Sequence, residues 1–168
     1  FSLYSKSVQD SFVISVQLPD NYYEDTKTKY PTVYMLDANF HFPMLASFVK
    51  QYEKGGLLPP IILIGIGYKS FELMDSLRLR DYLFPAALPS DEIKSVGGGQ
   101  RFYDFISNQL IPVVDKNYRT ETNNRSLLGH SFGGYFPLFT LLIQAEQNES
   151  IFRNFASADR KSTRLNSS

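Results

Sequence analysis

Six residues, at positions 129–134, constrain this chain more than any other segment. They read Gly-His-Ser-Phe-Gly-Gly, with the serine at position 131. An apolar run at 126–128 leads into them, and residues 135–143, which have helical apolar spacing, lead out. This is the nucleophile-elbow pattern, in which a strand ends, turns sharply through a serine and becomes a helix. A glycine-rich turn that happens to contain a serine is the alternative interpretation.

The residue types in this segment suit a strained turn. Gly129 and Gly133 are expected where the backbone is strained and where strand and helix come close together. Such a turn would lift the hydroxyl of Ser131 above the sheet edge, with His130 directing its side chain elsewhere. The N–H of Phe132 would lie at a helix N-terminus, aimed at a developing oxyanion. The pattern therefore predicts a nucleophile and one oxyanion donor.

The other groups that a serine hydrolase needs are not evident from the sequence. Such an enzyme uses a general base, usually histidine, and a carboxylate that orients it. In the α/β-hydrolase chain order both follow the serine. No histidine follows Ser131, and the two histidines are His41, far upstream, and the neighbouring His130. The catalytic machinery is therefore expected to be incomplete in this chain.

The last ten residues, 159–168, break off from the apolar pattern before them. A DNA sequence that encodes these ten residues resembles a widely used short-read sequencing adapter read in frame. We therefore expect residues 1–158 to be a partial domain and residues 159–168 to be a sequencing-adapter or cloning scar. A native polar, basic tail is the alternative. The chain also starts at Phe1 without a methionine, so both ends are expected to be cut and the chain to be a fragment that is truncated at its C-terminus as well.

Composition narrows the class of protein. The chain has 168 residues, 43% of them hydrophobic, which is enough for one domain with a core. Its net charge is zero, which gives no support for a nucleic-acid partner. There is no cysteine, so disulfides and thiolate metal sites are excluded. No stretch reaches the ~20 apolar residues of a membrane span.

Strand and helix patterns alternate along the chain. Alternating polarity at 2–8 and 11–18 predicts an antiparallel hairpin at a sheet edge. Residues 61–67 are the most strand-like segment and are expected to be central. The remaining predicted strands are 32–36, 126–128 and 152–158, and the predicted helices are 43–52, 101–116 with a kink at Pro112, and 135–143. Such alternation predicts an α/β fold with a mostly parallel sheet.

Two polar segments leave alternatives open. Asp37 ends a predicted strand, where it could be a ligand or an acid, although a turn at 37–39 is the simpler interpretation. Residues 78–82 mix charges of both signs and are expected to form a solvated loop, or else to border a substrate cleft.

Several motifs together resemble the esterase D-like, enterochelin esterase-like family of α/β-hydrolases. Residues 31–39 resemble the family's strand ending in Leu-Asp-Gly, with Ala38 in place of the glycine. Residues 60–68 resemble its central strand, and residues 80–82 its Arg-Asp loop. Residues 102–120 resemble the helix and turn before the elbow, and 129–134 match the elbow fully. The resemblance covers residues ~11–158 in order, which makes it far more specific than the elbow alone.

The resemblance implies an α/β-hydrolase fold, incomplete at the C-terminus, and a carboxylic-ester hydrolase (EC 3.1-type) with Ser131 as nucleophile. Its oxyanion hole would use the backbone N–H of Phe132 and that of Asn39, in the loop after the strand. The family's acid and histidine come from loops after later strands, so the chain by itself is expected to be inactive.

The resemblance implies no metal and no organic cofactor, and a small-molecule ester as the partner. It favours an exported bacterial protein and leaves a cytoplasmic one open. Two other functions stay open at this point. One is an acyltransferase, which passes the same acyl group to an alcohol, and the other is a non-catalytic module that binds a ligand or a partner.

Overall fold

The computed structural model describes residues 1–158, so the prediction of a scar at 159–168 lies outside the described residues. Six strands form one sheet in the order β1-β2-β4-β3-β5-β6. The strands are β1 (Ser2–Ser5), β2 (Asp10–Gln17), β3 (Tyr30–Met35), β4 (Ile62–Tyr68), β5 (Thr120–His130) and β6 (Asn154–Ala158).

The N-terminal hairpin is confirmed. β1 pairs antiparallel with β2, and β2 pairs antiparallel with β4. The other three pairings, β3 with β4, β3 with β5 and β5 with β6, are parallel. The sheet is therefore parallel except where the hairpin closes one edge, as the alternation of strands and helices predicted.

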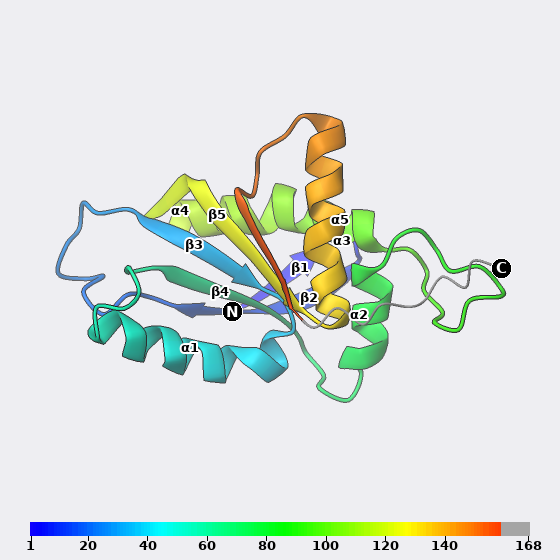
Figure 1. The fold of residues 1–168 in the computed structure, drawn as a ribbon, viewed down its shortest axis with the longest axis horizontal. Helices are drawn as coiled ribbons and strands as arrows, with labels where there is room; N and C mark the ends of the chain where they lie inside the picture. The colour runs from blue at the N-terminus through cyan, green and yellow to red at the C-terminus, as the bar shows by residue number, and fades with distance from the viewer. Residues whose placement is uncertain (159–168) are drawn as a thin grey trace.

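Helices cover both faces of the sheet (Figure 1). α1 (Ala38–Lys54) packs on one face, over a small cluster centred on Met35, Val49 and Leu63. The main core fills the other face, beneath α2 (Met74–Tyr82), α3 (Gly99–Phe105), η1 (Ile106–Leu110), α4 (Ile111–Asn117) and α5 (Phe132–Gln147). Within residues 1–158, no helix is both long and apolar enough to cross a membrane.

The position of β4 in the sheet follows from its sequence. All seven of its residues are buried, so both of its faces are covered. Ile62, Ile64 and Ile66 face the main core. On the other face α1 lies so close that a Cβ at Gly65 would be 2.4 Å from the ring of Phe42. The uninterrupted apolar run thus corresponds to a strand that is buried on both faces, and the prediction of a central strand is confirmed.

The predicted helix at 101–116 is found as three consecutive helical pieces, α3, η1 and α4. Pro112 lies at the start of α4, and the turn before it, η1, is a π-helix. Proline has no N–H and crowds the carbonyl of the preceding turn, so the helix widens there. The kink predicted at Pro112 is therefore found as a π-helical turn just before it. Residues of both α3 and α4 pack on the main core.

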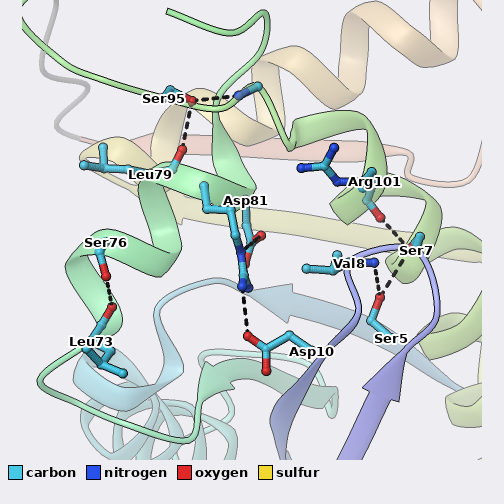
Figure 2. A network of polar contacts seen from close by, with 12 residues as sticks. Ser5, Ser7, Val8, Asp10, Leu73, Ser76, Leu79, Asp81, Ser95 and Arg101 are labelled. Atoms are coloured by element: carbon cyan, nitrogen blue, oxygen red, sulfur yellow. Dashed lines mark hydrogen bonds and ion pairs between the residues drawn. The ribbon is translucent and has the colours of Figure 1, made fainter.

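The prediction of a solvated loop at 78–82 is wrong, because these residues form the second half of α2. Asp81 and Tyr82 are buried, with 1% and 0% of their surface exposed. Arg80 donates two hydrogen bonds to Asp81, at 2.7 and 2.9 Å, and a third to Asp10, at 2.9 Å. Figure 2 shows this link between α2 and the hairpin. The charges are thus paired within the fold instead of solvated.

We expect Arg80→Met to destabilise the protein by about 3–5 kcal/mol, because it leaves the buried carboxylate of Asp81 without its cation. Urea denaturation measures the change. The matched control is Lys50→Met, which breaks an exposed pair with Asp20 (3.4 Å) and should cost less than about 1 kcal/mol. Equal effects of the two substitutions would contradict this account.

Candidate functional site

The chain bends sharply at Ser131. β5 ends at His130, α5 begins at Phe132, and Ser131 between them has φ 57° and ψ −121°. A positive φ in a residue other than glycine costs about 1–3 kcal/mol and persists only where the surroundings enforce it. The N–H of Ser131 donates to the carbonyl of Ala158 in β6 (2.9 Å), and its own carbonyl accepts from Gly134 (2.9 Å). Ser131 therefore lies at the carboxyl edge of the parallel strands, in a strained conformation.

Two glycines allow this bend. A Cβ at Gly129 would lie 1.8 Å from the carbonyl oxygen of Gly133, because the end of β5 and the first turn of α5 touch there. A Cβ at Gly133 would lie 2.7 Å from a carboxylate oxygen of Asp37. The start of α5 therefore lies against the residue that precedes α1, as well as against its own strand.

The N-terminus of α1 reaches the same edge of the sheet. β3 and β5 are parallel neighbours, with Met35 beside Leu128, and the N–H of Leu36 donates to the carbonyl of Leu128 (3.0 Å). Asp37 then adopts a left-handed conformation (φ 54°), and the helix starts at Ala38. Two helices thus begin side by side at the carboxyl ends of neighbouring strands, where α/β sheets bind ligands.

The structure places Asn39 in the first turn of α1, whereas the sequence predicted a loop there. Its side chain accepts a hydrogen bond from the N–H of Tyr68 (2.7 Å) and donates one to the carbonyl of Tyr68 (2.8 Å). This pairing extends the end of β4 and anchors the first turn of the helix. The first N–H groups of a helix have no partner within it, so the backbone of Asn39 presents a donor at this edge.

Asp37 is the charged centre beneath the two helix starts. Only 1% of its surface is exposed, and its carboxylate accepts hydrogen bonds from Arg78 (2.6 Å) and from the hydroxyl of Tyr82 (3.0 Å). Burial raises the pKa of Asp37, and the Arg78 cation and the Tyr82 hydroxyl oppose that rise. The simpler sequence interpretation, a turn residue, describes its backbone but misses this ion pair.

Arg78 connects Asp37 to the bend. The nitrogen that binds Asp37 also donates to the carbonyl of His130 (3.3 Å), and the guanidinium lies 5.7 Å from the centre of the Phe132 ring. Its side chain is only 11% exposed. One buried cation therefore contacts the residues on both sides of Ser131 and the residue before α1.

The two histidines, distant in sequence, meet beside the bend. The ring centres of His41, in α1, and His130, at the end of β5, are 5.2 Å apart. Partial burial lowers the pKa of His41; Asp37 opposes this effect, whereas the charges of His130 and Arg78 add to it. Sequence reasoning did not find this pairing, because it depends on the strand order.

A mixed sheet with a strained serine between a parallel strand and the helix that follows it is the arrangement of the α/β-hydrolases. Comparison with known proteins identifies the family. The family model described as "Putative esterase" matches residues 5–154, and the chain belongs to this family.

Two curated relatives are similar in sequence. The ferri-bacillibactin esterase BesA of Bacillus subtilis (strain 168) is 35% identical over 128 residues, which cover 70% of this chain and 44% of the relative. The apo-salmochelin esterase of Escherichia coli O6:H1 is 30% identical over 138 residues, which cover 77% of this chain and 41% of the relative. The chain thus spans less than half the length of these two proteins.

Solved structures agree in fold. The BES protein from Bacillus cereus superposes with a TM-score of 0.83 at 26% identity, over 100% of this chain and 65% of that one. The enterobactin hydrolase IroE in complex with DFP gives a TM-score of 0.75 at 25% identity, over 95% of this chain and 61% of that one. The predicted α/β-hydrolase fold and the resemblance to the enterochelin esterase-like family are both confirmed.

We expect Gly129→Ala to destabilise the protein by at least about 3 kcal/mol, because the new methyl group would collide with backbone that cannot move aside. Thermal or urea denaturation measures the loss. The matched control is Gly55→Ala at the end of α1, where the nearest atom to a Cβ is 3.5 Å away. That variant should stay within about 1 kcal/mol of the parent protein. A well-folded, fully stable Gly129→Ala would show that the strand and the helix do not touch as described.

We expect Arg78→Met to cost about 3–5 kcal/mol at neutral pH, because the carboxylate of Asp37 is then buried without its cation. Loss of Arg78 also raises the folded-state pKa of Asp37 further. A carboxyl group with a raised folded-state pKa destabilises the fold when ionised, so the deficit should narrow as the pH falls and Asp37 takes up a proton. Urea denaturation across acidic and neutral pH measures this trend. Arg78→Lys keeps the charge and should lose less stability than Arg78→Met. A loss of stability that does not depend on pH would contradict the ion pair between Arg78 and Asp37.

Proposed function

We propose that the protein is a carboxylic-ester hydrolase in which Ser131 is the nucleophile. The observation that carries the proposal is the backbone conformation of Ser131. This residue lies between a parallel strand and the start of a helix, and its φ is 57°. Strained residues of this kind cluster at catalytic sites, where the strain holds a side chain in position. Membership of the esterase family supports the same reaction.

The two helix starts supply the oxyanion donors in this proposal. The N–H of Phe132 is the first of α5, and the N–H of Asn39 lies in the first turn of α1. Helix N-termini carry partial positive charge and unpaired N–H groups, which favour a negatively charged oxygen. Removing one such donor in other hydrolases costs about 10²–10³-fold in rate.

Arg78 balances the charge of this neighbourhood. A lone carboxylate at Asp37 would lie next to Gly133 and repel an oxyanion that forms near the start of α5. Its ion pair with Arg78, at 2.6 Å, removes most of that repulsion. The same guanidinium holds the carbonyl of His130, and so it fixes the bend relative to α1. We therefore give Arg78 a positioning role in the reaction.

The reaction proceeds in two halves. The hydroxyl oxygen of Ser131 attacks the ester carbonyl carbon while a general base takes its proton, and the carbonyl oxygen becomes an oxyanion held by the two N–H groups. The carbon–oxygen bond to the alcohol then breaks, and the alcohol leaves with the proton. Water attacks the remaining acyl-serine ester in the same way and releases the acid.

The general base and its carboxylate belong, in this proposal, to residues beyond those described. In the family they follow later strands, and the chain spans less than half the length of the two curated relatives named above. Losing both groups costs about four to six orders of magnitude in rate. We therefore expect the 168-residue chain to be inactive by itself.

The substrate class follows from the relatives. Three of the proteins named above are, by name, an esterase of ferri-bacillibactin, an esterase of apo-salmochelin and a hydrolase of enterobactin, and we propose an ester of this siderophore class for this protein. Net charge does not distinguish one such ester from another, because the chain is neutral overall.

Appending the C-terminal part of BesA after Ala158 tests the function, because it supplies the groups placed beyond the described residues. We expect this chimera to hydrolyse p-nitrophenyl acetate about 10⁴-fold or more faster than the 168-residue chain. Ser131→Ala in the chimera should abolish that activity. Ser126→Ala, on the same strand, should leave it unchanged.

Two results would overturn the proposal. One is full activity of the chimera with Ser131→Ala, which would place the nucleophile elsewhere. The other is a well-folded chimera, shown by a cooperative melt, that has no serine-dependent activity.

A further inference from the structure

The two imidazoles of this 168-residue chain lie side by side. The sequence of 168 residues contains two histidines and no cysteine. His41 comes from α1 and His130 from the end of β5, yet their ring centres are 5.2 Å apart. The parallel pairing of β3 with β5 brings these two positions together, because α1 starts directly after β3. The fold thus joins every imidazole of the chain in one place.

The ring separation suits a shared metal ion. Zinc binds imidazole nitrogen at about 2.0–2.1 Å in tetrahedral geometry, which places two ring centres about 5 Å apart. Imidazole is a ligand that zinc, copper and nickel favour. We propose that His41 and His130 together bind one divalent transition-metal cation, represented by Zn²⁺, with water in the remaining positions.

The surroundings permit a cation at this place. His130 is exposed and His41 half-buried, so the pair can be reached from solvent. The nearest fixed charges, Asp37 and Arg78, are paired with each other at 2.6 Å and largely cancel.

The site has few protein ligands, and their number limits the expected affinity for the metal. Within the described residues, no three or more histidine, aspartate or glutamate side chains are grouped so that they could hold a metal. Among residues 1–158, His41 and His130 then supply the protein ligands, and each should be indispensable. Loss of an outer-sphere partner alone typically costs about 10–100-fold in metal affinity, so loss of either ring should cost at least about 10-fold.

The proposal does not rest on the esterase function and can be tested on the 168-residue chain without a histidine tag. Isothermal titration with zinc chloride measures the affinity and the stoichiometry, and proton NMR follows the ring protons of both histidines. Because there are only two histidines, one substitution assigns both sets of signals. We expect one zinc ion to bind per chain, and the NMR signals of both imidazole rings to shift together as zinc is added.

The variants are His41→Gln and His130→Gln, each expected to weaken zinc binding at least about 10-fold. Glu53→Gln is the matched control. It lies twelve residues from His41 on the same helix, about 18 Å along its axis, and should bind as the parent protein does. If His41→Gln does not fold, the exposed His130→Gln and the NMR titration of the parent chain decide the matter. No binding, a shift of one ring only, or binding that survives either histidine substitution would overturn the proposal.

Discussion

The whole site depends on how closely two helices approach the sheet. α1 lies so near β4 that Gly65 has no room for a Cβ, and α5 lies so near β5 that Gly129 has none. These two contacts fix where each helix begins, one on either face of the sheet. Because β3 and β5 are parallel neighbours, both starts then lie at one edge, and Ser131 lies between strand and helix. Close packing of each helix on its strand is thus the source of the geometry that the proposed reaction needs.

The ion pair between Asp37 and Arg78 offsets the electrostatic cost of this arrangement. Bringing a carboxylate, two histidines and two helix N-termini into one place would be costly if each charge stood alone. The structure places the Asp37–Arg78 pair at the centre, shielded from solvent, with the Tyr82 hydroxyl as a third partner. Arg78 comes from α2, which Arg80 ties to the hairpin through Asp10. The hairpin at the far edge of the sheet therefore helps to hold the residues around the bend.

Local patterns predicted most of the fold and only part of the site. The apolar run of β4 and the glycines around Ser131 are local signals, and they indicated a central strand and a bend. The role of α2 was missed, because the burial of Asp81 depends on Arg80 and a tightly packed core, neither of which a run of mixed charges reveals. The meeting of His41 with His130 was also missed, since it follows from strand order. The catalytic role of Ser131 stays a prediction.

The outer edge of β6 has a consequence for how the sheet can grow. Within residues 1–158, β6 pairs only with β5, and its sequence, Asn154–Ala158, contains no proline and no charge to block a further strand. Adjacent strands lie about 4.8 Å apart, so an added strand would run about 10 Å from β5. If it ran parallel, its carboxyl end would lie at the same sheet edge as Ser131, with β6 between it and β5. The unblocked edge of β6 thus determines which side chains a further parallel strand would bring close to the bend.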